Sequence, residues 1–387
     1  VRLHQAINEK LFDADPQVQP QALVALGSFE VDDEVAAALI AAYPRLQNGW
    51  LQSAALGVAN SAPRKMIETA LAARDPQSLR TLVTQLTQKL AEKQDAEEAA
   101  SLVIAMVSKP ATADPLKQSV LEGLTQALRA DVRPGWSVSL QTAFERLFQS
   151  PNEDLSIAAL PLAVRWDTSR RLDNTVNPLL ERLIAAIKDV NHAEDQRLKI
   201  AQSLLAVRHV NESILPGILS VLGSNASESL QRGLLETLGG LPGAKIGAAI
   251  IESYPKLNNS LQGAAFTQLM KRGEWALLFL DALQAKKVDP QTIGPANLHR
   301  LRTHADSKVA SRANQIIDEL RGPEAKEKDA LIAKFTPAVE KTGNVAKGKE
   351  LFTQNCANCH KFGNDGREVG PVLTGMGAHG PAELLVH

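Results

Sequence analysis

The feature that most constrains the fold is an apolar pattern with helical spacing that recurs along most of the chain. Apolar residues at i, i+1, i+4, i+5 and i+8 fall on one face of an α-helix. No stretch keeps the alternation of a β-strand, so the chain is predicted to be all-α. Three such faces are Leu179, Leu180, Leu183, Ile184 and Ile187; Ile214, Leu215, Ile218, Leu219 and Leu222; and Leu230, Leu234, Leu235 and Leu238.

Composition agrees with helices. Of the 387 residues, 44% are apolar but only 4% are aromatic, whereas sheets favour aromatic and β-branched residues. The apolar share excludes a disordered chain. A formal net charge of −1 gives no electrostatic reason to expect nucleic acid as a partner. No run approaches 18 apolar residues, so no membrane span is expected.

An internal sequence repeat indicates which kind of all-α fold the chain adopts. Residues 43–55 (YPRLQNGWLQSAA) resemble residues 254–265 (YPKLNNSLQGAA), with Trp50 as a one-residue insertion. The only two tyrosines of the sequence stand at equivalent points, 211 residues apart, which divides into five units of about 42 residues. Helix pairs of that length bury their apolar faces by stacking on their neighbours. We therefore predict a HEAT/armadillo-like α-solenoid.

Six pairs of a capping residue and a proline predict helix starts. The capping side chain accepts a hydrogen bond from a free amide, and proline at the first helical position loses nothing because its missing N–H would have no partner there. Glu153, three residues after Ser150, would complete a capping box. The pairs are Asp15-Pro16, Asp75-Pro76, Asp114-Pro115, Ser150-Pro151, Asn177-Pro178 and Asp289-Pro290.

The repeat region is expected to offer a surface rather than catalysis. It contains no Gly-rich phosphate loop, and four of its histidines have no Cys, His or carboxylate at a recognised ligand spacing. These histidines are His192, His209, His299 and His304. The four tryptophans, which we expect to be core wedges between helices, are Trp50, Trp136, Trp166 and Trp275.

Glycine marks a boundary near residue 342. Eight of the 24 glycines fall in residues 343–387, so a helical region gives way to a short, loop-rich module. The mixed Lys/Glu stretch before it is expected to be a solvated helix after Pro323. We predict a solenoid over residues 1–322, a helical linker over 323–341 and a separate module over 342–387.

The chemistry is expected in that module. The only two cysteines are Cys356 and Cys359, and His360 follows them. C-x-x-C-H is the pattern of covalent c-type haem attachment. Two thiols three residues apart can form thioethers to one haem edge, and the adjoining histidine then falls under the iron as its proximal ligand. We therefore expect one covalent haem c, with His360 on the haem iron.

Two alternatives for the cysteines stay open. A structural zinc needs four ligands, so His379 and His387 would have to complete the set. A thioredoxin-like dithiol normally follows a β-strand within a βαβ unit, which the sequence does not predict.

The residues around the motif resemble the cytochrome c family. Residues 345–352 open a short helix, residues 363–366 make a loop, and Gly370-Pro371-Val372-Leu373 follows ten residues after the histidine. The resemblance implies a partial class I cytochrome c-like module in which Gly370, Pro371 and Leu373 are haem-binding residues. By that resemblance, the Pro371 carbonyl accepts the Nδ1–H of His360, which leaves Nε2 for iron. Leu373 would pack on the porphyrin.

A second resemblance reaches further back along the chain. Residues 269–288 and 301–306, which lead into the module, are similar to the PVC-type haem-binding CxxCH proteins. These are large bacterial extracytoplasmic polypeptides with HEAT-like repeats before a C-terminal c-type cytochrome, and many carry a propeller similar to sugar dehydrogenases. The resemblance covers about residues 250–387. It implies a periplasmic or otherwise extracytoplasmic electron carrier with a redox partner or a fused dehydrogenase domain. The sequence given has no such propeller and its cytochrome part is short, so dehydrogenase activity is not carried over to this chain.

Two functions follow as hypotheses. The first is electron transfer by a covalently bound haem, with the repeats as a docking scaffold. The second is a non-catalytic interaction scaffold whose haem module is incomplete or vestigial. The chain starts at Val1 without Met and ends in an apolar run, which indicates a piece of a longer protein.

The sixth iron ligand is expected beyond His387. Met376 comes only five residues after Pro371, roughly 17 Å of extended chain, and glycines flank it, so it is expected to turn and pack at the haem rim. His379 and His387 are candidate substitute ligands, and neither is expected to be needed for the folding of residues 1–340.

Overall fold

The computed structural model describes residues 2–15, 17–46, 48–320, 322–380 and 384–385. Pro16, His387 and the side chain of His379, which the sequence singled out, lie outside the described residues. The chain divides into two compact units, Val1–Gln268 and Leu269–His387. The predicted domain boundaries at residues 322 and 341 stay a prediction.

The first unit is built from helices joined by short turns, some of them one-turn 3-10 helices (η). In chain order they are α1 (Arg2–Lys10), α2 (Val18–Leu26), α3 (Asp33–Ala42), η1 (Tyr43–Arg45), α4 (Gly49–Ala59), α5 (Pro63–Ala70), η2 (Gln77–Leu79), α6 (Arg80–Glu92), α7 (Ala96–Met106), η3 (Ala111–Ala113), α8 (Asp114–Ala127), α9 (Val138–Phe148), α10 (Glu153–Trp166), α11 (Asp173–Ala186), α12 (Glu194–Ala206), α13 (Ile214–Leu219), α14 (Glu228–Gly240), α15 (Ala244–Ser253), η4 (Tyr254–Lys256) and α16 (Asn259–Leu269).

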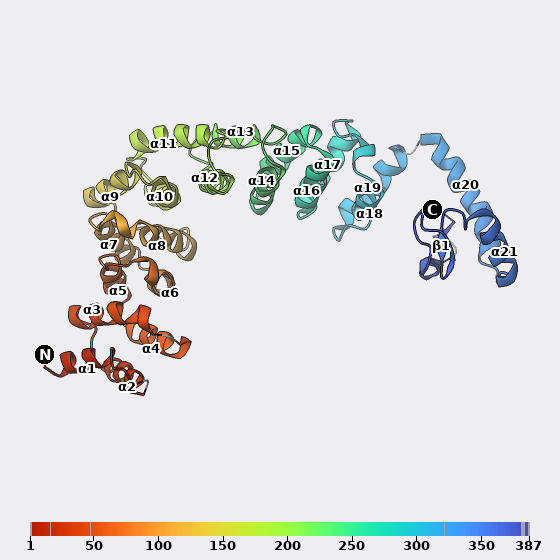
Figure 1. The fold of residues 1–387 in the computed structure, drawn as a ribbon. Helices are drawn as coiled ribbons and strands as arrows, with labels where there is room; N and C mark the ends of the chain where they lie inside the picture. Colours follow the sequence, from red (N-terminus) through yellow and green to blue (C-terminus); the bar gives the residue numbers. More distant parts are fainter. Residues whose placement is uncertain (1, 16, 47, 321, 381–383, 386–387) are drawn as a thin grey trace. The chain divides into compact units, whose positions relative to one another are not determined.

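These helices stack in two rows. Each odd-numbered helix from α1 to α13 contacts the next odd-numbered one, and each even-numbered helix from α2 to α12 contacts the next even-numbered one. Figure 1 shows the two rows side by side through the first unit. A helix that contacts the helix two places along the chain is the defining feature of an α-solenoid. The predicted all-α, HEAT/armadillo-like fold is confirmed.

Stacking covers apolar helix faces that a helix pair by itself would leave in solvent. The predicted faces of α11 and α14 are buried, including Leu180, Leu183, Leu234 and Leu238 at 0% exposure. Burying such a side chain contributes about 1.5–3 kcal/mol, so a helix pair without neighbours would lose most of its stabilisation. The solenoid therefore depends on its nearest-neighbour interfaces.

The two copies of the predicted repeat fall on equivalent elements of the structure. Tyr43 and Tyr254 are both buried and begin η1 and η4, which end α3 and α15. In each copy an asparagine caps the next helix, since Asn48 Oδ1 accepts the Leu51 amide at 2.8 Å and Asn258 Oδ1 accepts the Leu261 amide at 2.9 Å. Burial raises the pKa of the Tyr43 hydroxyl above its usual range.

The predicted repeat length of about 42 residues was wrong. In the described residues, six helix pairs rather than five separate the two tyrosines, because η1 and η4 follow α3 and α15. Over the 211 residues between them, the mean repeat is about 35 residues. Division by a family-typical length cannot reveal short helices such as α13, which has six residues.

Most predicted helix starts were also wrong. Asp289 caps as expected, at the 3-10 helix η5, with Oδ1 accepting the Gln291 amide at 2.9 Å. Asp15 Oδ1 likewise accepts the Gln17 amide at 2.8 Å, just before α2 begins at Val18. Pro178 lies inside α11, and Asp114 is the first residue of α8, where it pairs with the buried Lys117 at 2.8 Å. The other pairs precede their helices: η2 begins after Pro76, and Asn152, not Ser150, caps α10. Asx-Pro marks a turn near a helix more reliably than its first residue.

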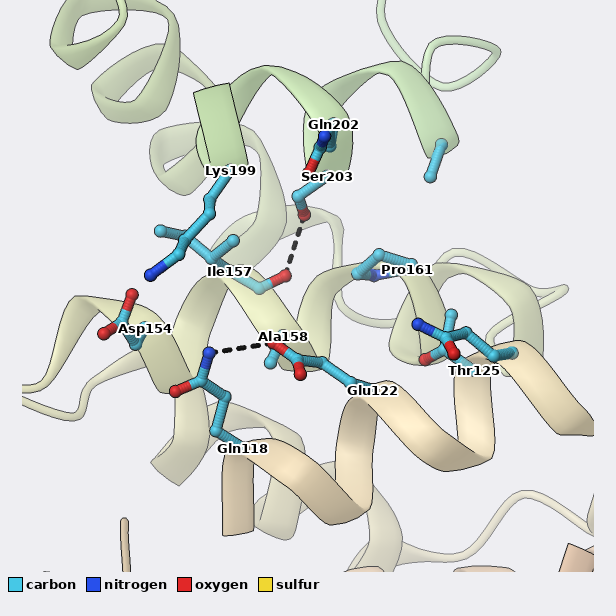
Figure 2. Close-up of a pocket in the computed structure, with 12 residues that line it drawn as sticks. Gln118, Glu122, Thr125, Asp154, Ile157, Ala158, Pro161, Lys199, Gln202 and Ser203 are labelled. Atoms are coloured by element: carbon cyan, nitrogen blue, oxygen red, sulfur yellow. Dashed lines mark hydrogen bonds between the residues drawn. The ribbon is translucent and has the colours of Figure 1, made fainter. Parts of the chain in front are cut away.

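Pro161, in the middle of α10, shows how a solenoid accommodates a broken helix ladder. Proline has no N–H, so the Ile157 carbonyl four residues earlier loses its helical donor. The Ser203 hydroxyl of α12 donates to that oxygen at 2.8 Å, as Figure 2 shows. A neighbouring repeat therefore replaces the missing hydrogen bond.

The four tryptophans differ in how deeply they are buried. Trp166 and Trp275 are buried core residues, and Trp136 is half-buried and stacks on Phe144 with ring centroids 6.3 Å apart. Trp50 is 87% exposed, so its predicted role as a core wedge was wrong. The buried face of α4 starts at Leu51, and the extra residue of this repeat stands on the solvent side of the first turn.

The second unit has a helical and a loop-rich part. Its elements are α17 (Gly273–Gln284), η5 (Pro290–Thr292), α18 (Pro295–Arg302), α19 (Ser307–Leu320), α20 (Gly322–Val339), α21 (Val345–Asn355), β1 (Lys361–Phe362), β2 (Asp365–Gly366) and η6 (Met376–His379). α19 packs against both α17 and α18. α20 is the helix expected in the Lys/Glu stretch, and it begins at Gly322, one residue before Pro323. Among the described residues, no helix is long and apolar enough to cross a membrane.

Candidate haem site

Helix α21 delivers the cysteines. Asn344 caps it, with Oδ1 accepting the Lys347 amide at 3.0 Å, and the helix ends at Asn355. The chain then turns through the C-x-x-C-H motif, where the His360 amide donates to the Cys356 carbonyl at 2.9 Å. Both thiols are free; Cys356 is half-buried and Cys359 is exposed. Cys356, Cys359 and His360 therefore belong to one tight turn.

A small hairpin follows, which was not expected in an all-helical chain. β1 and β2 pair antiparallel, with Lys361 opposite Gly366. Gly366 has φ +95°, and a Cβ there would overlap the His360 carbonyl oxygen. Glycine is therefore required at this position to let the hairpin close against the histidine backbone.

The histidine ring is held from the side of the Gly-Pro-Val-Leu segment. The His360 Nδ1 lies 2.8 Å from the Pro371 carbonyl oxygen, the contact that the cytochrome c resemblance implies. With Nδ1 as the donor, Nε2 keeps its lone pair for a ligand. A Cβ on Gly370 would lie 2.7 Å from His360 Cε1 and 3.0 Å from Nδ1. Gly370 thus lets the backbone pass directly against the imidazole.

Backbone hydrogen bonds fix this segment beside the motif. The Gly370 amide donates to the Cys359 carbonyl at 2.6 Å, and the Leu373 amide donates to the Lys361 carbonyl at 2.8 Å. The Thr374 hydroxyl oxygen also accepts the Gly363 amide at 2.8 Å. The structure therefore brings together all six predicted site residues: Cys356, Cys359, His360, Gly370, Pro371 and Leu373.

Ion pairs tie the surface of the module together. Lys349 Nζ lies 2.8 Å from Asp365 Oδ2, which links α21 to the hairpin and raises the pKa of Lys349. Lys361 Nζ lies 2.5 Å from Glu368 Oε1 and lowers the pKa of that carboxyl. Both pairs are solvent-exposed and add little to stability.

The module has no core of its own. None of the described residues from 342 to 385 is buried. Several large apolar side chains stand in solvent, among them Leu351 at 49%, Phe362 at 53% and Val372 at 47% exposure. A segment of this size is below the length that normally builds a sufficient core without a cofactor or neighbour. Two free thiols, an imidazole with a free Nε2 and an uncovered apolar surface together fit a haem.

Met376 lies where the glycines indicated a turn. Gly375 has φ +92°, in the left-handed region, and η6 begins at Met376. The Met376 amide donates to the Leu373 carbonyl at 3.1 Å, and its side chain is half-buried. The chain therefore turns back at Met376 instead of extending away from the Pro371 side.

Sequence reasoning missed three supporting residues. Gly366 lets the hairpin close, and Thr374 links the Gly370 segment to the hairpin turn at Gly363. Asn344 caps the start of α21. The signal for Asn344 was available, because asparagine before an amphipathic run is a preferred N-cap. The role of Thr374 depends on a contact across 11 residues, which no local pattern reveals.

Comparison with known proteins gives a family match near the C-terminal end and similar structures over most of the chain. The family model for cytochrome c matches residues 345–385. Over most of its length the chain is similar in structure to importin beta, in a crystal structure obtained in an ammonium sulfate condition, with 12% identity, 92% of this chain and 52% of that chain covered, and a TM-score of 0.44. It is also similar to a homology model of the full-length AP-3 complex in an intermediate open conformation, with 12% identity, coverage of 90% and 55%, and a TM-score of 0.37.

The chain spans about half the length of each of these structures. The solenoid assignment rests on the helix contacts themselves. At the C-terminal end, the C-x-x-C-H turn and the His360–Pro371 contact lie within residues 345–385, the segment that is similar to the cytochrome c family.

Proposed function

We propose that this chain is an electron-transfer protein that carries one covalently attached haem c. The observation that carries the proposal is the His360–Pro371 contact at 2.8 Å within a C-x-x-C-H turn, inside a segment similar to cytochrome c. A bound haem would supply a one-electron redox centre.

Each site residue has a separate role in this proposal. Cys356 and Cys359 hold the haem edge through thioethers, and His360 presents Nε2 to the iron. Pro371 fixes the ring orientation through its carbonyl, and Gly370 provides the space for the ring. Leu373 and the exposed Phe362 cover porphyrin surface, which gives the module the apolar contacts that it lacks by itself.

Met376 is proposed to pack at the haem rim, and the sixth ligand to come from elsewhere. Met376→Ala in the oxidised holoprotein tests this. The near-infrared methionine–iron charge-transfer band, if it is present and lost in the variant, would make Met376 the ligand. An unchanged spectrum supports the packing role.

We infer that the solenoid docks a redox partner, either a separate protein or a fused dehydrogenase domain. The support is a repeat fold that offers extended surface and, in its described residues, no gathering of three or more His, Cys, Asp or Glu side chains able to hold a metal. Because thioether formation takes place outside the cytoplasmic membrane in bacteria, the proposed location is the periplasm or an equivalent compartment.

The test is expression of the full chain with cytochrome c maturation machinery, followed by haem staining of a denaturing gel and measurement of the Soret band. The wild type should retain haem after denaturation, and a Cys356→Ser, Cys359→Ser double variant should not. Asn358→Ala, which changes an exposed residue between the cysteines, is the matched control and should retain haem. A wild type that takes up no haem under these conditions would favour the alternative, an interaction scaffold with a vestigial module.

A further inference from the structure

Two segments of the haem module lie side by side and are joined at successive points. We call residues 359–363 the first segment and residues 370–374 the second segment. The backbone makes two of the joints, from the Gly370 amide to the Cys359 carbonyl and from the Leu373 amide to the Lys361 carbonyl. The last joint is made by a side chain, because the Gly363 amide donates to the Thr374 hydroxyl oxygen at 2.8 Å. Thr374 therefore closes the two segments at the hairpin turn, where Gly363 has φ +60°.

The contact that orients the histidine ring lies between these joints. The Pro371 carbonyl oxygen, which belongs to the second segment, is 2.8 Å from His360 Nδ1. The position of that oxygen depends on how the second segment is anchored on each side of Pro371. Proline has no N–H and cannot anchor itself through a backbone amide. On the C-terminal side, the segment is held by the Leu373 amide and the Thr374 hydroxyl.

The chain gives the second segment no substitute for the Thr374 hydroxyl. Thr374 has the only polar side chain among residues 370–374. Directly after it, Gly375 has φ +92°, in the left-handed region, and the Met376 amide donates back to the Leu373 carbonyl at 3.1 Å. Without the hydroxyl, the Leu373 amide alone would hold the segment after Pro371. A shift of a few tenths of an ångström would move the contact at His360 Nδ1 toward the weak end of the hydrogen-bonding range.

We propose that Thr374 is a positioning residue for the His360 ring and acts on it through Pro371. The Thr374 hydroxyl holds the second segment, and the segment holds the Pro371 carbonyl against His360 Nδ1. That hydrogen bond makes the ring a stronger donor to iron and so favours the oxidised state. The inference rests on the proposed haem attachment, and it adds a residue that adjusts the reduction potential of the same site.

Thr374→Val tests the proposal, because valine has the shape of threonine but cannot accept the Gly363 amide. Thr374 is exposed, so the change disturbs no core. In a potentiometric titration of the holoprotein, the ratio of reduced to oxidised protein at a fixed potential should rise about twofold, which is about 18 mV at 59 mV per tenfold for one electron. Thr374→Ser keeps the hydroxyl and should restore the wild-type potential.

Thr353→Val is the matched control. It removes an exposed hydroxyl from the same module, one that donates to the Lys349 carbonyl of α21 at 2.9 Å and makes no joint between the two segments. Its potential should equal that of the wild type. Both valine variants should retain covalent haem on a denaturing gel, since the cysteines are intact.

A second measurement does not require haem. Hydrogen exchange of the full chain, followed by mass spectrometry in peptides covering residues 361–373, reports how firmly the two segments are joined. Thr374→Val should speed this exchange about two- to tenfold, the ratio that corresponds to one lost hydrogen bond, whereas Thr374→Ser and Thr353→Val should not.

The two measurements separate this inference from the proposed function. A wild-type chain that takes up no haem would contradict the proposed function, and the exchange rates would then decide whether Thr374 holds the segment. Equal potentials in Thr374→Val and Thr353→Val, a serine variant as far from the wild type as the valine variant, or unchanged exchange in Thr374→Val would each overturn the proposal.

Discussion

Gly370→Ala should loosen the histidine without removing the haem. The added Cβ would lie 2.7 Å from His360 Cε1, whereas carbon atoms in contact are about 3.5–4.0 Å apart. The backbone cannot retreat easily, because the Gly370 amide is hydrogen-bonded to the Cys359 carbonyl at 2.6 Å. The imidazole must therefore move by about 0.8 Å.

That displacement is enough to break the contact with Pro371. The Nδ1···O distance would grow from 2.8 Å to about 3.6 Å, which is outside hydrogen-bonding range. Losing the bond costs about 0.5–1.5 kcal/mol. Because the bond makes the ring a stronger donor to iron and so favours the oxidised state, its loss should raise the reduction potential by about 20–60 mV for this one-electron couple.

The assay is a potentiometric titration of the holoprotein, read from its haem absorbance. Gly377→Ala is the matched control, because a Cβ at Gly377 meets nothing within 4 Å. Both variants should retain covalent haem, since the cysteines are intact. Equal potentials in the two variants would refute the reasoning that Gly370 positions the ring.

Three further predictions concern the solenoid. Ser203→Ala should destabilise the protein by about 1–3 kcal/mol in urea unfolding, because it orphans the Ile157 carbonyl. The free-energy cost of Ser203→Ala should be smaller in a Pro161→Ala background, because alanine returns an N–H to α10 that can donate to the Ile157 carbonyl. Equal costs in both backgrounds would contradict the idea that Ser203 replaces the hydrogen bond lost at Pro161. The Val35 amide lowers the pKa of Asp32, so the cap should stabilise α3 above the ordinary aspartate pKa and fail as the pH falls through the lowered value; Asp32→Asn should show a flatter stability–pH curve below pH ~4. Deleting residues 342–387 should leave the helical melting at 222 nm unchanged, and a cooperative loss of helicity would contradict independent folding.

Local patterns predicted those parts of the protein that depend on neighbouring residues in the chain. The apolar faces of α11 and α14 were predicted because a buried helix face has a fixed period. The C-x-x-C-H turn needed only five consecutive residues. The equivalence of Tyr43 and Tyr254 was visible because both copies keep the same turn and cap.

What only the tertiary structure decided depends on contacts between residues far apart in the chain. The burial of Trp166 against the exposure of Trp50 depends on which helix face meets a neighbour, and the number of repeats depends on helices too short to show a period. Ser203 replaces the hydrogen bond that Pro161 removes only because α12 stacks on α10. The cavity lined by residues of α8, α10 and α12 likewise exists only where three helices meet, since a cavity is a property of packing and not of any single segment.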